Sequence, residues 1–169
     1  MKSEAAYDYH NESLRQALHA ESRGGGISIK IVIPGKPIAK SRPRFVRRGE
    51  YVITYNAQET EEGRWLLSAR GQIPEPIQGP VEMFCEFIFD RPKSHYGTGK
   101  NSNKLKPSAP AYHTQKPDTS NLIKWVEDCL NTEAYKDDSQ IVELTGIKRW
   151  ADIGEGAKTV ISMIELETT

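Results

Sequence analysis

The segment Lys116-Pro-Asp-Thr-Ser-Asn-Leu-Ile-Lys124 determines how the second half of this chain folds. Pro117 disfavours a helical backbone at Lys116, and the four residues that follow it are of the types that cap helices by accepting hydrogen bonds from free N–H groups. We therefore predict a helix that begins within this segment. Its buried face follows at helical spacing, and Asn121, Lys124 and Asp128 share another face. The apolar positions are Leu122, Val126, Cys129 and Leu130.

A second segment, Tyr135-Lys-Asp-Asp-Ser-Gln140, follows this helix and precedes a predicted strand over 141–150. The turn between helix and strand could bring Asp138 back beside Asp118. Carboxylate oxygens suit Mg²⁺, which keeps water and substrate phosphate oxygens in its other positions. A lysine at position 124 would neutralise phosphate charge. Either fragment alone is more typical of a cap or a solvated turn, but together they predict a divalent-metal phosphodiesterase site.

These two segments resemble those of the RusA family of Holliday-junction resolvases, the crossover-junction endodeoxyribonucleases. The likeness covers roughly Ile27 to Leu166, because further blocks agree in the same order. These blocks are Pro34-Gly-Lys-Pro37, Lys40-Ser-Arg-Pro-Arg44, Arg91-Pro-Lys-Ser-His95, Val126-Glu-Asp-Cys-Leu130 and Lys148.

The resemblance implies an α+β fold, a single small domain whose mixed β-sheet is packed by about two helices. It also implies a homodimer that cuts four-way junction DNA at symmetric positions with Mg²⁺, or Mn²⁺ as a substitute. Carried onto this sequence, the family motif places its first aspartate on Asp118, its lysine on Lys124 and its late aspartate on Asp138. Asp118 and Asp138, with Asp137 as an auxiliary contact, are the expected metal ligands.

The chain departs from the family at Ser120, where the second aspartate of the motif is expected. Serine carries no charge and binds Mg²⁺ more weakly than a carboxylate does. Asp137 or Asp128 could compensate, or Ser120 could act in the site through a water. The alternative function is a junction-binding protein that has lost cleavage. A third possible function is an RNA-binding module that uses the basic residues of this chain.

The net charge of the chain is zero, but its basic residues are segregated. Residues 27–48 hold seven Lys or Arg and residues 91–117 hold six, with no Asp or Glu in either stretch. Such runs are typical of loops that grip DNA phosphates, with a solvated charged face as the alternative. Phe45 and Tyr51 are candidates for contact with unstacked bases. The predicted DNA-binding residues are Lys36, Lys40, Arg42, Arg44, Arg47, Arg48, Lys93 and Lys116.

The 169 residues suit one domain, which we place at 27–169 after a flexible N-terminal extension of residues 1–26. No apolar run could span a bilayer and the extension has no signal-peptide core, so we expect no membrane partner. Cys85 and Cys129 lie in apolar patterns, which favours free buried thiols and a cytoplasmic location. No P-loop, dinucleotide or zinc pattern occurs, so we expect no nucleotide cofactor.

The remaining pattern predicts alternating strands and helices joined by basic loops. Residues 27–33, 51–54 and 81–89 read as strands, 36–50 as a basic loop, and 57–70 as a helix that ends before Gly71. Residues 147–150 and 158–166 are predicted to pair as a hairpin.

Residues 91–117 form a connection long enough to suggest a function, and we favour a substrate-contacting flap over a passive insertion. His95 and His113 flank it, and for each of them a structural role and contact with phosphate or metal are both open. The three tryptophans are expected to pack in the core or at a dimer interface.

Overall fold

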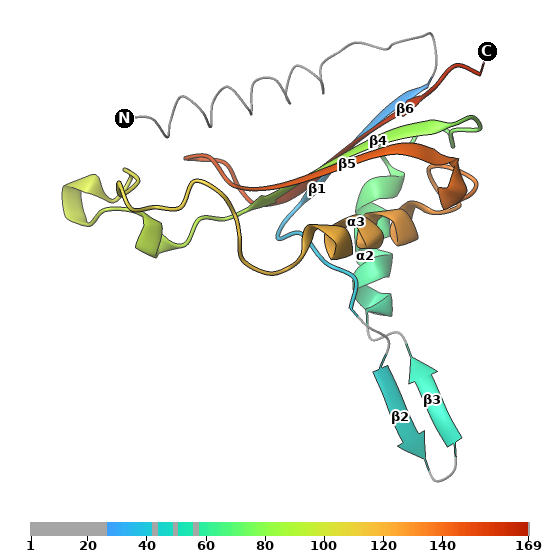
Figure 1. Ribbon diagram of the computed structural model, residues 1–169, viewed down its shortest axis with the longest axis horizontal. Coiled ribbons are helices and arrows are strands. Elements are labelled where there is room, and N and C mark those ends of the chain that lie inside the picture. The colour runs from blue at the N-terminus through green and yellow to red at the C-terminus, as the bar shows by residue number, and fades with distance from the viewer. Residues whose placement is uncertain (1–26, 42–43, 49–50, 56–57, 169) are drawn as a thin grey trace.

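The computed structural model describes residues 27–41, 44–48, 51–55 and 58–168. A four-stranded sheet in the order β1-β6-β4-β5 carries the helices α2 and α3 beneath it, and a separate two-stranded hairpin, β2–β3, projects away (Figure 1). This arrangement confirms an α+β fold with a mixed sheet and two helices. The predicted extension over residues 1–26 lies outside the described residues. The elements are β1 (Ser28–Pro34), β2 (Arg44–Arg48), β3 (Tyr51–Tyr55), α2 (Glu59–Arg70), β4 (Val81–Phe89), α3 (Thr119–Leu130), β5 (Ile141–Trp150) and β6 (Lys158–Glu165).

The core lies between the sheet and the two helices. On β1, Ile29, Ile31 and Ile33 are buried while their neighbours are exposed, which is the alternation of a strand with one covered face. Strand β4 is the exception, because its last five residues are all buried. A strand that is apolar on both faces belongs in the interior of a sheet, and β4 lies between β6 and β5.

The predicted hairpin between β5 and β6 is wrong. Strand β4 separates the two, pairing parallel with β5 and antiparallel with β6. Strand β6 also pairs antiparallel with β1. The physical reason is the composition of β4: the most buried strand takes the interior position, where both of its edges are paired and the middle of the sheet covers it best, and that position separates β5 from β6.

The loop predicted over residues 36–50 is partly wrong as well. Residues 44–48 form β2, which pairs antiparallel with β3 in register from Arg44 opposite Tyr55 to Arg48 opposite Tyr51. Three arginines in five residues obscured the strand pattern. The available signal was the spacing: two residues, Gly49 and Glu50, separate the paired strands, as in a tight hairpin.

Helix α3 begins where the sequence predicts. Asp118 is its N-cap residue with an extended backbone, and the buried face of α3 includes the four predicted apolar positions together with Trp125. The helix lies close against β5 at Gly146, where an added Cβ would approach the Cδ1 atom of Ile123 to 2.5 Å. This close approach sets the distance between the N-terminal half of α3 and β5.

The connection over residues 91–117 extends beyond the end of the sheet (Figure 1) and is folded on itself. It contains two short 3₁₀ turns, Lys93–His95 and Gly99–Asn101. An isolated antiparallel bridge pairs Tyr96 with Leu105 on either side of the second turn. The backbone N–H of Lys106 donates to the carbonyl oxygen of His95 at 2.9 Å. The connection is therefore held by its own hydrogen bonds.

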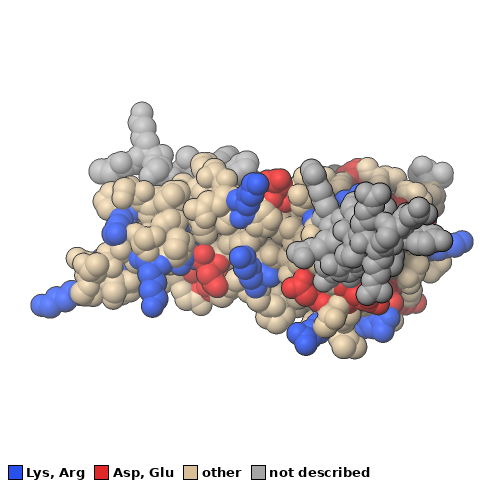
Figure 2. Space-filling view, turned by 90° about the horizontal axis from the view of Figure 1, so that it is seen from below, with Lys and Arg blue, Asp and Glu red and all other residues tan. Residues whose placement is uncertain are grey.

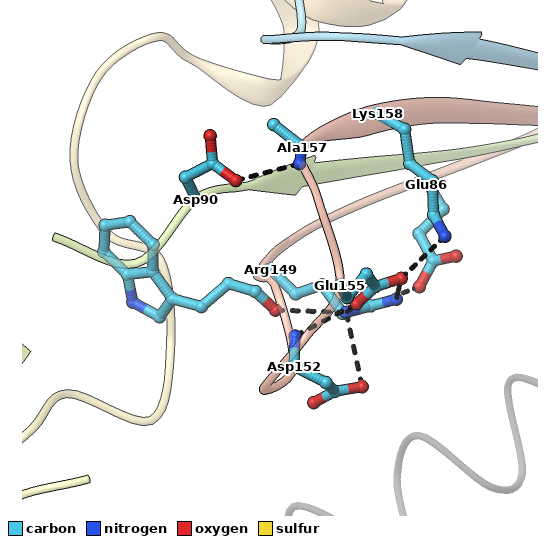
Figure 3. A network of polar contacts seen from close by, with 8 residues as sticks. Glu86, Asp90, Arg149, Asp152, Glu155, Ala157 and Lys158 are labelled. Atoms are coloured by element: carbon cyan, nitrogen blue, oxygen red, sulfur yellow. Dashed lines mark hydrogen bonds and ion pairs between the residues drawn. The ribbon is translucent and has the colours of Figure 1, made fainter. Parts of the chain in front are cut away.

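Three elements are tied together on the sheet face opposite the helices by Arg149 of β5 (Figure 3). Its Nε atom donates to Glu86 of β4 at 2.6 Å, and its NH1 and NH2 atoms donate to both oxygens of Glu155 in the β5–β6 connection. The Arg149 side chain is 7% exposed. Charges this deeply buried need partners, and this one has three, since Oδ2 of Asp152 also lies 3.7 Å from its NH1 atom. Cys85 and Cys129 are free and buried, as predicted, and none of the described helices could cross a membrane.

Candidate active site and DNA-contacting surface

Asp118 stands at the junction of the long connection and α3. Its carboxylate is exposed and makes no capping hydrogen bond with the helix, although the residue occupies the N-cap position. The segment before it is fixed by Lys148 of β5, whose Nζ atom donates to the carbonyl oxygens of Gln115 and Pro117, each at 2.7 Å. The fold thus anchors the backbone of this segment and leaves the acidic side chain available.

Asp137 and Asp138 lie in a 3₁₀ turn, Asp138–Gln140, that leads into β5. Asp137 caps this turn: its side chain accepts from the N–H of Ser139 at 2.9 Å. Hydrogen bonding from the Ser139 side chain, and to a smaller extent from this N–H, lowers the pKa of Asp137. The Gln140 side chain closes a capping box and reaches the carbonyl oxygens of Ile77 and Gly79. The structural task of Asp137 is therefore clear, whereas Asp138 is exposed and takes no part in the cap.

Glu127 of α3 is a candidate for the site that sequence reasoning missed. Burial raises its pKa, and the negative charges of Asp138 and Asp128 raise it further, while Lys124 lowers it. Ser120, Lys124 and Glu127 recur at helical spacing and lie along one stripe of α3. That spacing was the signal available in the sequence, but only the fold brings Asp138 near this stripe.

Asp128, considered as a replacement for the missing aspartate, has a different task. Its Oδ2 atom lies 2.9 Å from Nζ of Lys40, which is also 3.9 Å from Glu62 of α2. Burial lowers the pKa of Lys40, but the hydrogen bond and charge of Asp128 outweigh it, so the pKa is raised. The backbone N–H of Lys40 also donates to the Asn121 carbonyl. Lys40, predicted to bind DNA, thus joins the segment after β1 to both helices.

The described residues contain no group of three or more Asp, Glu, His or Cys side chains arranged to hold a metal ion. The structure does not bring Asp138 back beside Asp118, because Asp118 is the N-cap of α3 whereas Asp138 follows the C-terminal end of α3 and leads into β5. The two aspartates therefore lie at opposite ends of a 12-residue helix, and Glu127 lies near Asp138. Their oxygen donors suit a hard cation that takes one or two carboxylates and completes its shell with water and phosphate oxygens. They do not form an all-protein cage.

Lys and Arg side chains are spread over the helix side of the molecule with acidic groups between them, in the part that grey atoms leave visible (Figure 2). Lys36, Lys93 and Lys116 are exposed. Arg42 lies outside the described residues. Arg44, Arg47 and Arg48 lie on β2, of which the structure describes the backbone.

His113 belongs to an aromatic cluster at the end of the sheet. Its ring centroid lies 4.3 Å from that of Phe89 and 4.1 Å from that of Trp150, and His95 contacts the edge of Trp150 at 5.1 Å. Burial lowers the pKa of His113, and the positive charges of Lys148 and Lys36 lower it further. The His95 pKa is lowered by burial and by the charges of Arg91 and Lys106. Both histidines therefore pack against Trp150, and their lowered pKa values favour the neutral imidazole.

Comparison of the sequence with known proteins places the chain in a family. Residues 34–162 match the family described as endodeoxyribonuclease RusA. The chain is also 35% identical over 127 residues to YqaN, an uncharacterized protein of Bacillus subtilis (strain 168), with 73% of this chain and 89% of that protein covered. The matched span contains both helices, the long connection and the Asp137–Asp138 turn. The chain therefore belongs to the RusA endodeoxyribonuclease family, which implies DNA endonuclease activity.

Proposed function

We propose that the protein is a structure-specific endodeoxyribonuclease that cuts four-way DNA junctions with the help of a divalent metal ion. The observation that carries the proposal is the state of Asp118. A helix N-cap aspartate ordinarily accepts hydrogen bonds from the helix N–H groups, but this side chain makes none and is exposed. Lys148 secures the backbone next to it. An acidic group held in this way is available to a ligand.

The residues present fit Mg²⁺ or Mn²⁺ as a site with few protein ligands. Asp118, an exposed carboxylate at the start of α3, would hold the ion. Asp138, exposed beyond the other end of the helix with Glu127 near it, would hold a second. When bound there, the ion would supply Lewis acidity to the phosphodiester and make water a stronger nucleophile at neutral pH. Asp137 supports this arrangement indirectly, because it fixes the turn that presents Asp138.

Two residues on the α3 stripe complete the site. Lys124 is exposed and would place its ammonium group on the phosphate that is cut. Glu127 would add negative charge beside Asp138, while Asp128 is bound to Lys40. Ser120 is exposed on the same stripe and contributes a neutral hydroxyl.

A homodimer would provide two such sites. Resolving a four-way junction requires one cut in each of two strands, and a two-fold symmetric dimer matches the near-symmetry of that substrate. The basic residues outside the site would contact phosphates without reading sequence.

The decisive experiment offers the purified chain a labelled four-way junction and a linear duplex of matching sequence, with Mg²⁺ and with chelator. Paired nicks in the junction alone, only in the presence of metal, are the expected result. Cleavage of both substrates at equal rates would refute the structure specificity, and cleavage in chelator would refute the metal.

A second candidate is a protein that binds junctions without cutting them. The neutral side chain of Ser120, exposed on the α3 stripe, favours it. Tight junction binding with no nicks in either Mg²⁺ or Mn²⁺ would establish this function in place of the first.

A further inference from the structure

The side chains at one end of the sheet enclose an open pocket of about 320 Å³. It lies where β4 and β5 end and where residues 113–116 return toward α3. Lys116, at its rim, is two residues before Asp118. Whatever occupies this pocket is therefore next to the segment that presents the candidate catalytic carboxylate.

Three aromatic rings form the floor of the pocket: Phe89, His113 and Trp150. They pack against one another at the centroid separations given above, and their exposed fractions are 4%, 6% and 3%. The indole N–H of Trp150 donates a hydrogen bond of 3.1 Å to the carbonyl oxygen of Tyr112. Since none of these rings offers a free face, the floor cannot stack a nucleobase, and the rim must provide recognition.

The rim is basic. Lys36, Arg91 and Lys116 line it, and none of the three forms an ion pair with an acid in the described part of the chain. Arg91 is held in place by a hydrogen bond from NH1 to the carbonyl oxygen of Pro110 and lies over Trp150, 5.9 Å from the ring centroid. One carboxylate, Asp90, lies among them, and its Oδ1 atom accepts from the N–H of Ala157. With three cationic side chains and one carboxylate, the pocket lining carries a net positive charge that favours an anion.

We propose that this pocket binds one phosphodiester group of the DNA backbone on the Lys116 side of the cut strand. The inference rests on the proposed function and adds a defined subsite to it. The pocket is larger than a phosphate alone, so it has room for the flanking sugars. Because no ring face is open, the contact reads the backbone and not the base.

The test measures affinity for a four-way junction at a series of salt concentrations in chelator, so that cleavage plays no part. The double variant Lys36→Gln with Lys116→Gln is compared with Lys30→Gln, an exposed lysine of β1 outside the pocket. If one phosphate occupies the pocket, the slope of log affinity against log salt should fall by about one unit in the double variant and stay unchanged in the control.

Two other slopes would overturn the proposal. An unchanged slope in the double variant would mean that the pocket contacts no phosphate. A fall of about two units would mean that the lysines contact separate phosphates and do not share a subsite.

A spectroscopic readout separates this inference from the proposed function. The imidazole C–H signals of His113 should shift when a short single-stranded oligonucleotide is added to the wild type, and not in the double variant. A shift of equal size in both proteins would count against the pocket. A junction that is bound with the expected slope but never cut would refute the nuclease and leave the subsite standing.

Discussion

The ammonium group of Lys148 donates a hydrogen bond of 2.7 Å to the carbonyl oxygen of Pro117, the residue immediately before Asp118. Lys148, on β5, therefore positions the candidate catalytic carboxylate of Asp118 by holding the backbone next to it. The same Nζ atom also bonds to Gln115, so a single residue fixes two carbonyl groups of the segment.

Replacing Lys148 with methionine should lower the single-turnover rate of junction cleavage about tenfold or more, because a small displacement of a reacting group is costly in rate. Lost hydrogen bonds should also reduce the free energy of unfolding by about 1–3 kcal/mol. Rapid-quench kinetics at saturating junction and urea unfolding measure the two effects. Lys104→Met, an exposed lysine of the long connection, is the matched control. An unchanged rate in a destabilised Lys148→Met protein would leave Lys148 a purely structural role.

Asp118→Asn should abolish cleavage and leave junction affinity within a few fold of the wild type. The change removes a carboxylate charge needed for a metal ion while retaining the lysines and arginines that contact phosphate. Gel-shift titration in chelator gives the affinity and denaturing gels give the nicks. The carboxylate of Glu75, exposed in the connection before β4, provides a Glu→Gln control that should cut normally. Cleavage at the wild-type rate by Asp118→Asn would exclude it as a ligand.

The neighbouring acids Glu127 and Asp128 should respond differently to neutralisation. Glu127→Gln should raise the Mg²⁺ concentration needed for half-maximal cleavage, since Glu127 lies near Asp138. Asp128→Asn should leave that requirement unchanged and lower the thermal midpoint, since it breaks the ion pair with Lys40. A metal titration of both variants decides between the two residues. Equal metal requirements in wild type and Glu127→Gln would show that Glu127 has no part in the site.

Stability should decline as the pH falls from about 7.5 to 5.5. Folding lowers the pKa of His113 below its ordinary value of 6.5, so the unfolded chain binds protons more readily. The stabilisation is complete above pH 6.5 and is lost as the pH falls through 6.5 toward the folded pKa, by up to about 1.4 kcal/mol per pH unit. His113→Phe, which keeps the aromatic packing, should flatten this slope in urea unfolding. His95 has a lowered pKa too and leaves a residual slope. An identical slope in wild type and variant would contradict the assignment.

Arg149→Met should reduce the free energy of unfolding by about 3 kcal/mol, because it leaves the carboxylate of Glu86 buried without its partner. Adding Glu86→Leu removes that stranded charge and should restore part of the loss. Glu155 keeps Lys158 as a neighbour at 2.9 Å in both variants. Denaturant unfolding of the two variants provides the comparison. A double variant less stable than Arg149→Met would contradict this account.

Local patterns predicted the parts of the fold that depend on neighbouring residues. Helix α3 and its start at Asp118 follow from Pro117, the polar cap residues and the apolar spacing, all within one segment. The order of the strands does not, because it depends on how β4 competes for two neighbours distant in the sequence.

The same division applies to the site. The acids at 118 and 138 could be named from the sequence, whereas the tasks of Asp128 and Lys148 depend on partners brought from elsewhere in the chain, Lys40 and Pro117. The spacing of Glu127 from Lys124 and Ser120 is visible in the sequence, but its relation to Asp138 arises only when the turn after α3 folds back.

The parallel pairing of β4 with β5 has an evolutionary consequence. Parallel neighbours need a crossover connection, and here that crossover contains the long connection, α3 and the Asp137–Asp138 turn. Every candidate catalytic residue therefore belongs to a single excursion that leaves the sheet after β4 and rejoins it at β5. Under the proposed function, insertions and deletions over residues 91–117 would alter which DNA shapes are accepted without disturbing strand register. Substrate choice and folding would then be free to diverge separately.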